Sequence, residues 1–376
     1  MRRFQPLLAA IVILVVIEAL SFGGLAVLRR IRPRLLWSPD AAAFAAGYPG
    51  YLLAHDTLLG WPKPGTGPRP SPAFPDTGAS CVSLFGDSFT YGAEVGDDAA
   101  WGNVLAQRLG CRVANYGVGG YGTDQAFLRY RDRADEQAPI VILGIFEDNV
   151  QRNVNRLREL LAGSPEFSFK PRFKLGARDE LVLLPLHLPD TSQARAFIES
   201  PERFLTDEYF LPGSPAGPVR PRFPFTLSLV RLLVHPDVRA VLTGHPYWER
   251  YYRPGHDSGA LETTMGIVRA FRDETSRKGQ RLLIVLFPSP KTMSKPDAAR
   301  ARPYQPLIDR IHTERIPIVD LSEGILVRLS GRTPCEIATQ PGACRGHLNP
   351  EGNAWVAEIV STALSREGWV KDRGAR

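Results

Sequence analysis

Short apolar runs alternate with segments of helical pattern along this chain, and this alternation constrains the fold more than any other feature. The apolar runs are residues 81–85, 111–115, 139–146, 281–287 and 316–320. Helical patterns lie near residues 97–109, where Asp97 or Asp98 can form the N-cap, near 123–136, and at 350–366. Parallel strands need a crossover connection, which is usually a helix, so this alternation predicts a parallel sheet covered on both faces. We therefore predict an α/β fold with a doubly wound, parallel, five-stranded sheet and helices on both of its faces.

A long apolar stretch stands at the N-terminus. Residues 6–28 are 23 residues with one charge, Glu18, which is long enough to cross a bilayer. A cleaved signal peptide usually has a shorter apolar core, so we predict an uncleaved, single-pass signal-anchor and assign residues 1–35 to it and its basic flank. Arginines flank the stretch at positions 2, 3, 29, 30, 32 and 34. Their excess on the C-terminal side favours a cytoplasmic domain, whereas the cysteines and the chemistry discussed below favour the opposite orientation.

The rest of the chain divides by composition. Residues 36–80 form a linker and lead-in, and the part from 56 to 79 holds six prolines, which exclude a regular helix. We predict a folded domain over 81–376. An insertion at about 157–255, with a hairpin near 170–186, interrupts its rhythm of strands and helices. This insertion is either a substrate-binding cap at the functional edge of the sheet or a structural excursion away from that edge.

Charge and cysteine usage narrow the classes of partner. The 376 residues carry a net charge of +7, but no basic run interleaved with aromatic residues predicts nucleic-acid binding. The four cysteines form no C-x-x-C pair and the histidines show no ligand spacing, so we expect no metal and no cofactor. An even number of cysteines fits disulfides in an oxidising compartment. Cys335 can pair with Cys344 across a short loop, and Cys81 can reach Cys111 if their strands are neighbours; buried free thiols are the alternative for the second pair.

Polar and small residues follow the strands in a pattern typical of nucleophilic catalysis. The turn Gly86-Asp87-Ser88 comes directly after the first strand. The further candidates are Asn115 and Gly120 after the second strand, Asn149 after the third, and His347 before the last helix. In an open α/β sheet, ligands bind at the carboxyl ends of the strands, where we expect these residues to meet. A serine nucleophile needs a base for its proton and donors for the oxyanion, and this set contains both.

These segments resemble the SGNH, or GDSL, hydrolase family in its membrane-anchored bacterial form. The resemblance covers residues 81–153 and 316–366. It implies an SGNH/flavodoxin-like fold, with Ser88 as the nucleophile and His347 as the catalytic base. The oxyanion hole that it implies consists of Ser88, Gly120 and Asn149. The supporting residues are Asp87, Asn115 and Asp148, and Asp148 also competes with Asn149 because the spacing in Gly144-Ile-Phe-Glu-Asp-Asn149 is longer than in the family.

The chain departs from the family at one position near the histidine. The family usually has an aspartate three residues before it, to orient the imidazole, and here that position is Cys344. Three interpretations follow. A backbone carbonyl orients His347 and leaves a Ser-His dyad, a carboxylate such as Glu336 or one in the insertion substitutes, or the site is degenerate and the protein is a binder.

The resemblance implies a serine esterase or an O-acyltransferase that works through a Ser-His acyl-enzyme. Water as the second acceptor gives hydrolysis and a sugar hydroxyl gives transfer, and the same residues serve both. The expected substrate is an acyl ester, in particular an acetyl ester, of a cell-surface glycan or a small molecule, with proteins of a surface-polysaccharide system as partners. Two alternatives stay open: a catalytically weak carbohydrate-binding or assembly protein, and a lipid esterase or thioesterase at the membrane. The expected location is the bacterial inner membrane, with a periplasmic domain.

Overall fold

The structure is a computed structural model, and it describes residues 5–75, 78–133, 136–162, 168–295 and 302–371. The flanking arginines at positions 2 and 3 therefore lie outside the described residues. The chain forms two compact units. The first consists of Met1–Trp61, Val154–Pro171 and Pro185–Glu249. The second consists of Pro62–Asn153, Arg172–Leu184 and Arg250–Arg376, so the segment that we expected as an insertion contributes to both units.

A five-stranded parallel sheet forms the centre of the second unit, as the alternation of apolar runs predicts. Its strands are β1 (Val82–Phe85), β2 (Val113–Asn115), β3 (Ile140–Phe146), β6 (Arg281–Phe287) and β7 (Ile318–Asp320). They follow the order β2-β1-β3-β6-β7, and every neighbouring pair is parallel. Val82 of β1 stands opposite Val113 on one side and Ile140 on the other. In chain order, β2 is added on one side of β1, and β3 is then added on the other side. The place between β1 and β3 is therefore a topological switch point, where α/β proteins bind ligands.

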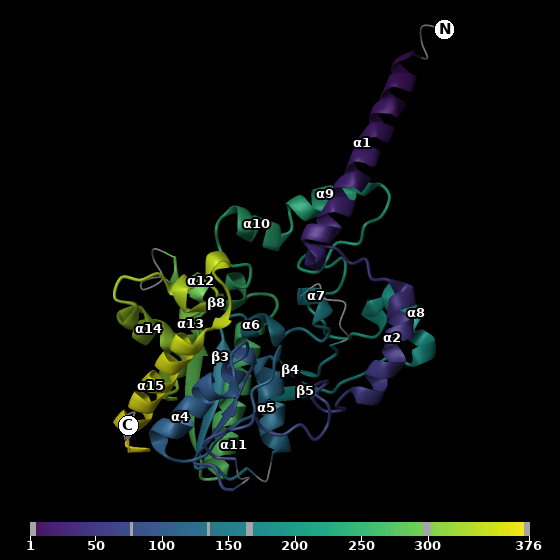
Figure 1. Cartoon of the computed structure of the whole chain (residues 1–376). Helices are drawn as coiled ribbons and strands as arrows, with labels where there is room; N and C mark the ends of the chain where they lie inside the picture. The colour runs from purple at the N-terminus through teal and green to yellow at the C-terminus, as the bar shows by residue number, and fades with distance from the viewer. Residues whose placement is uncertain (1–4, 76–77, 134–135, 163–167, 296–301, 372–376) are drawn as a thin grey trace. The chain divides into compact units, whose positions relative to one another are not determined.

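Helices cover both faces of this sheet (Figure 1). One face carries α4 (Trp101–Leu109), α14 (Leu321–Leu329) and α15 (Pro350–Arg366). The other face carries α5 (Thr123–Asp132) and α11 (Ala260–Arg277), with α13 (Gln305–Thr313) against α11. Side chains alternate along β1, so Val82 and Leu84 join the core under α4 and α15 while Phe85 packs on Phe271 of α11. The prediction that Asp97 or Asp98 caps the helix near 97–109 is wrong, because the N-cap of α4 is Ala100.

Short elements complete the second unit. They are the helices α3 (Ser88–Tyr91), α6 (Asn149–Arg152) and α12 (Pro290–Met293), the hairpin β4 (Arg172–Leu175) and β5 (Leu181–Leu184), and the hairpin β8 (Ala338–Gln340) and β9 (Arg345–Leu348). The predicted hairpin near 170–186 is thereby confirmed, and it packs on α11, where a Cβ at Gly266 would lie 2.9 Å from Leu175. Both expected cysteine pairs form disulfides, Cys81–Cys111 and Cys335–Cys344.

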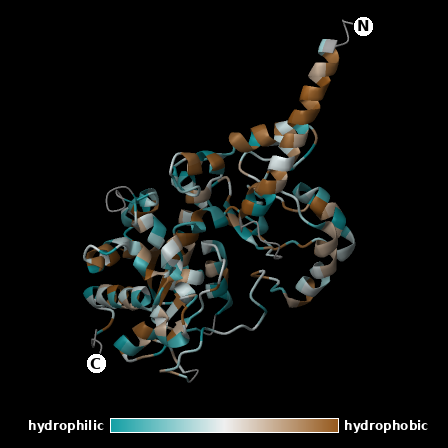
Figure 2. Ribbon diagram, turned by 45° about the horizontal axis from the view of Figure 1, so that its top comes forward, coloured by the Kyte–Doolittle hydropathy of each residue, from teal (hydrophilic) through white to brown (hydrophobic). Residues whose placement is uncertain are grey.

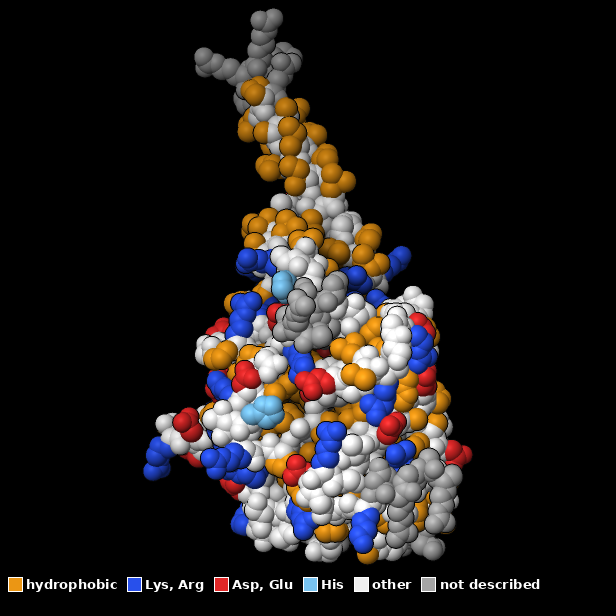
Figure 3. All heavy atoms as spheres, turned by 90° about the vertical axis from the view of Figure 1, so that its left-hand side faces the viewer, with side chains coloured by type: hydrophobic (Ala, Val, Ile, Leu, Met, Phe, Trp, Pro, Cys, Tyr) orange, Lys and Arg blue, Asp and Glu red, His pale blue; other side chains and the backbone are white. Residues whose placement is uncertain are grey.

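The first unit is built from helices and loops. Its helices are α1 (Gln5–Ile31), α2 (Ala41–Ala54), α7 (Glu159–Ala162), α8 (Ala194–Glu199), α9 (Phe225–Leu233) and α10 (Pro236–Leu242). Aromatic side chains hold α2 to α8, with the rings of Phe44 and Phe197 centred 5.5 Å apart. Residues 6–31 of α1 are long and apolar enough to cross a membrane. Apolar side chains cover the length of this helix in Figure 3. This helix and the disulfides together suggest that the folded units lie outside the cytoplasm.

Candidate active site

Ser88 occupies the turn between β1 and α3. It is the first residue of α3, and its N-cap is Asp87, which accepts a hydrogen bond from the Phe89 backbone N–H at 2.9 Å. Gly86 is required at the turn, because a Cβ there would lie 2.6 Å from the Gly144 carbonyl oxygen of β3. Ser88 is partly exposed, and its hydroxyl makes no hydrogen bond within the described part of the chain. The turn thus presents a serine side chain at the switch point of the sheet.

Asp87 lies directly beneath this serine in a buried charged network. Its side chain is 1% exposed, and its Oδ2 accepts hydrogen bonds at 3.0 Å from Asn149 Nδ2 and from the Arg152 guanidinium. Arg152 also pairs with Asp148 at 2.5 Å. Asn149 donates further to the Tyr121 carbonyl at 3.3 Å, so its amide faces Asp87 and Tyr121 in this structure. Asp148 and Asn149 therefore both reach the site, the first through Arg152 and the second directly.

Asn115 joins the glycine loop to the nucleophile turn. Its Oδ1 accepts from the Gly117 N–H at 3.0 Å, and its Nδ2 donates to the Thr90 carbonyl at 2.9 Å. Gly117 passes so close to α3 that a Cβ would lie 2.5 Å from the backbone nitrogen of Tyr91. Gly120 then takes a left-handed conformation, with φ of 82°. Asn115 is therefore a structural clamp that holds the loop with Gly120 against the helix of Ser88.

His347 is positioned by a carboxylate that the sequence analysis did not select. Its Nδ1 lies 3.0 Å from Oε1 of Glu94, in a contact too bent for a hydrogen bond of good geometry. Its backbone N–H donates to the other oxygen of Glu94 at 3.2 Å and to Thr339 Oγ1 at 3.1 Å. Its ring packs on Phe89, the residue after Ser88, with ring centroids 4.8 Å apart. These contacts bring His347 to the nucleophile turn.

Glu94 is held as an anion by its neighbours. The Thr339 hydroxyl donates to Oε2 of Glu94. This hydrogen bond, together with the one from the backbone N–H of His347 and the nearby imidazole, holds the pKa of Glu94 below its usual range, although partial burial opposes the effect. A carboxylate beside Nδ1 can keep an imidazole in one orientation and stabilise its protonated form.

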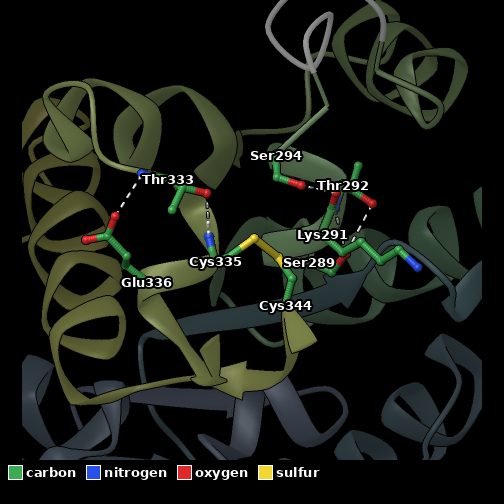
Figure 4. Close-up of a disulfide and its surroundings, with 8 residues drawn as sticks. All are labelled: Ser289, Lys291, Thr292, Ser294, Thr333, Cys335, Glu336 and Cys344. Carbon is green, nitrogen blue, oxygen red and sulfur yellow. Dashed lines mark hydrogen bonds between the residues drawn. A yellow bond between two sulfur atoms is a disulfide. The ribbon is translucent and has the colours of Figure 1, made fainter. Parts of the chain in front are cut away.

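The residues of the hairpin leave room for Glu94 beside His347. Cys344, at the position where the family has the acid, is in the disulfide and takes a left-handed φ of 48°. Gly346 has a φ of 85°, and a Cβ there would lie 2.7 Å from Oε2 of Glu94. Glycine therefore leaves the space that Glu94 fills. The suggested acid Glu336 instead accepts a hydrogen bond from the Thr333 N–H at 3.1 Å in a helix cap (Figure 4).

Arg69, in the proline-rich lead-in, fixes the segment that carries Glu94. Its guanidinium donates to the carbonyl oxygens of Tyr91 at 2.8 Å, Gly92 at 2.5 Å and Val95 at 2.7 Å. It also pairs with Asp97 at 2.7 Å, and the residue is 7% exposed. Glu94 has a φ of 67°, a conformation that costs a non-glycine residue about 1–2 kcal/mol. Because one arginine holds the chain on both sides of Glu94, we infer that Arg69 is a positioning residue.

The Cys335–Cys344 disulfide closes the hairpin that carries both Thr339 and His347 (Figure 4). We predict that the double variant Cys335→Ser/Cys344→Ser loses about 2–3 kcal/mol of unfolding free energy, because the bond closes a short loop. If His347 is the base of an esterase, as proposed below, the kcat of this variant should fall between about tenfold and 10²-fold, since misplacing a catalytic group by about 1 Å has effects of that size. Thermal unfolding and ester hydrolysis measure the two effects.

The Cys81–Cys111 pair is the matched control for that prediction. It joins the starts of β1 and β2, at the opposite edge of the sheet from Ser88. The variant Cys81→Ser/Cys111→Ser should lose stability but keep its kcat at temperatures where it is folded. Equal losses of kcat in both double variants would contradict a specific role of the Cys335–Cys344 bond.

Glu147 is a buried carboxyl group next to the site. Burial raises its pKa to about 8, although hydrogen bonds from Ser289 and Thr292 oppose this. Its Oε1 accepts from the Thr292 hydroxyl at 2.7 Å, and its backbone carbonyl accepts from Tyr252 at 2.8 Å. Glu147 is therefore protonated at neutral pH and structural in its contacts.

The raised pKa of Glu147 has a consequence for stability. The folded state keeps this proton up to about pH 8, whereas the unfolded chain releases it near pH 4.5, so the unfolding free energy should fall as pH rises between these values. Glu147→Gln removes the titration and keeps an acceptor for Thr292. We expect its melting temperature to decline less than that of the unchanged protein between pH 5 and pH 9, by differential scanning fluorimetry. Parallel curves would contradict the assignment.

No cluster of three or more potential metal ligands occurs among the described residues.

Comparisons with known proteins identify structural neighbours at low identity. No protein-family model and no curated protein matches the sequence. A lipolytic protein of the G-D-S-L family from Desulfitobacterium hafniense is 12% identical, with a TM-score of 0.36 over 75% of this chain and 98% of its own. An acetylxylan esterase from Geobacillus stearothermophilus is 14% identical, with a TM-score of 0.40 over 79% and 99%. An SGNH-hydrolase family esterase is 13% identical, with a TM-score of 0.31 over 78% and 98%. Two of these three structural neighbours are thus described as members of the GDSL or SGNH family, and the third as an acetylxylan esterase.

Proposed function

We propose that this protein is a serine esterase or O-acyltransferase whose catalytic residues are Ser88, His347 and Glu94. The contact between Glu94 and the Nδ1 of His347 carries this proposal. Because Cys344 stands where the family has an aspartate, the sequence favoured a Ser-His dyad or a degenerate site. Glu94 supplies a carboxylate that can orient His347 in its place. The clamp of Asn115 and the buried charge of Asp87 support the same assignment, because they hold the nucleophile turn in place.

The reaction proceeds through a covalent ester. The Nε2 of His347 takes the proton of Ser88 as the hydroxyl attacks the ester carbonyl. The backbone N–H groups of Ser88 and Gly120 stabilise the oxyanion, and His347 then protonates the leaving alcohol. Asn149 donates to Asp87 and Tyr121 in the ground state, and it can join the oxyanion donors by releasing one of these two acceptors. Water or a sugar hydroxyl then takes the acyl group from Ser88.

The proposed substrate is an acetyl ester of a cell-surface glycan. An apolar N-terminal helix and two disulfides suggest an extracytoplasmic domain, where such glycans lie within reach. Partner proteins of a surface-polysaccharide system belong to the same proposal. A lipid esterase or thioesterase is the second candidate, and the helix that can cross a membrane favours it.

Covalent trapping tests the proposed nucleophile. The full-length protein in detergent is treated with a fluorophosphonate, and digestion followed by mass spectrometry should find the label on Ser88. The variant Ser88→Ala should stay unlabelled, while the control Ser294→Ala, at an exposed serine, should label normally. Labelling of Ser88→Ala at the level of the unchanged protein would exclude Ser88 as the nucleophile.

Acyl-chain length separates the two candidate substrates. The unchanged protein should hydrolyse an acetyl ester faster than a decanoyl ester of the same alcohol. A pronounced preference for the decanoyl ester would exclude the glycan hypothesis and favour the lipid esterase. Failure to hydrolyse either ester above the Ser88→Ala background would favour the carbohydrate-binding alternative.

A further inference from the structure

Two helices of the first unit, α9 and α10, expose large apolar side chains. These residues are Leu227, Val230, Leu233, Val241 and Leu242 of the helices, with Phe223 before α9 and Val234 at its C-cap, and they are between 50% and 77% exposed. Leu227, Val230 and the C-cap Val234 are spaced by three and four residues and share one face of α9, whereas Ser228 and Leu232 on the opposite face are buried. A helix surrounded by water normally has polar residues on its open face. The exposed face of these helices is therefore suited to contact with an apolar partner, such as a protein surface or a membrane.

The start of α9 is fixed to the middle of α1. The carboxylate of Glu18 accepts hydrogen bonds from the backbone N–H groups of Phe225 at 2.5 Å and Thr226 at 3.2 Å. These N–H groups have no partner within their own helix, and an anion is favourable at a helix N-terminus. The Ser21 hydroxyl also lies 3.1 Å from that of Thr226. The one acidic residue in the apolar stretch of α1 thus serves as a cap for α9.

From this point α9 runs beside the second half of α1. The ring of Phe22 packs on Phe225 with centroids 5.1 Å apart. A Cβ on Gly24 would lie 3.9 Å from Leu229. Further on, Leu25 and Leu232 join one buried cluster. Figure 2 shows the hydrophobic colour of α1 continuing on α9. The contacts of α9 therefore fall on residues 18–28 of a helix whose apolar stretch extends from Pro6 to Ile31.

Exposed basic residues lie in the same segments as these apolar side chains. Residues 220–244 contain four arginines and one acidic residue, Asp237. The exposed arginines of this region and of the adjoining end of α1 are Arg29, Arg30, Arg32, Arg222, Arg231 and Arg239. Each basic residue near an anionic membrane surface contributes roughly 1 kcal/mol of attraction. The positive charge of these arginines therefore complements anionic lipid headgroups.

We propose that α9 and α10 lie in the surface of the bilayer that α1 crosses, as a second membrane contact. An amphipathic helix with basic residues beside its apolar face lies in the plane of the interface in this way. The apolar stretch of 26 residues in α1 exceeds the roughly 20 that a bilayer requires, so its C-terminal part can reach the interface beside α9. The proposal includes that α1 stays attached to the folded protein, where Leu25 and Leu232 share one buried cluster.

Site-specific labelling tests this contact in the full-length protein. The described cysteines are all in disulfides, so an added cysteine can be labelled alone. An environment-sensitive fluorophore is placed at Val230→Cys, Leu233→Cys or Leu242→Cys, and each protein is reconstituted in phosphatidylethanolamine–phosphatidylglycerol vesicles. The control is Val327→Cys on α14 of the second unit, where the apolar side chain is 77% exposed.

Lipids with a nitroxide on the upper acyl chain should quench the labels on α9 and α10 at least about twofold more than the control, because interfacial helices bury their apolar face about 5–10 Å into the headgroup region. Equal quenching at all positions would overturn the proposal. A blue-shifted but unquenched label whose shift grows with the protein-to-lipid ratio would also overturn it, because a second copy of the chain would then cover the surface. None of the labelled residues is assigned to the catalytic site, so the outcome is independent of the proposed reaction.

Discussion

Replacing Glu94 by glutamine is expected to lower kcat for acetyl ester hydrolysis by about 10²–10⁴-fold, with little change in KM. The amide keeps the size of the side chain but loses the negative charge that faces Nδ1 of His347 at 3.0 Å. In the proposed mechanism, the imidazolium that forms as Ser88 attacks then has no counter-charge, and the amide NH₂ group can favour the wrong tautomer. The effect appears in kcat because the charge of the imidazole develops only in the transition state.

The matched control for this prediction is Glu336→Gln. Glu336 is on the same hairpin region as His347 but serves as a helix cap with Thr333. Its substitution should change kcat by less than about threefold, since a cap contributes roughly 1 kcal/mol to stability and nothing to the reaction. A normal kcat in Glu94→Gln would show that another group orients His347. Equal losses in both variants would indicate a general disturbance of the hairpin.

Replacing Arg152 by methionine is expected to destabilise the second unit by about 3–5 kcal/mol, which corresponds to a fall in melting temperature of about 6–20 °C. The guanidinium of Arg152 is 7% exposed and lies 3.0 Å from Asp87, whose side chain is 1% exposed. Methionine fills most of the volume but leaves the Asp87 carboxylate buried without its cation. Such an unpaired charge is costly in a medium of low polarity. Differential scanning fluorimetry of the full-length protein measures the change.

The control for Arg152 is an ion pair of the same kind at the surface. Arg328 lies 2.8 Å from Glu358, and the two side chains are 26% and 42% exposed. Arg328→Met should therefore cost less than about 1 kcal/mol, because water screens the charge that is left behind. If Arg152→Met and Arg328→Met lose the same unfolding free energy, burial does not determine how much the pair of Arg152 and Asp87 contributes to stability.

The sheet could be predicted from the sequence because its strands are buried on both faces. Runs such as 139–146 and 281–287 are apolar at nearly every position, as central parallel strands are, and the structure has β3 and β6 there. The serine turn could be predicted for a related reason. A glycine is needed where β1 passes close to β3, and the serine follows it in the chain.

The partner of His347 could not be predicted, because nothing near it in the sequence indicates Glu94. The two residues are 253 positions apart, and the contact depends on the left-handed backbone of Glu94 and on the space at Gly346. The hydrogen-bond partners of Asn149 could also not be predicted from the sequence. The strand order places it after β3, but only the structure directs its amide at Asp87.

The separation of Glu94 from His347 bears on when the protein can act. Ser88 and Glu94 are made early and share one short segment, whereas the hairpin with His347 is made about 250 residues later. The contact between Glu94 and His347 therefore cannot form until the late part of the chain has been made and the hairpin with His347 has folded. Under the proposed mechanism, a partly made or partly exported chain has Ser88 and Glu94 but lacks its base, and is inert.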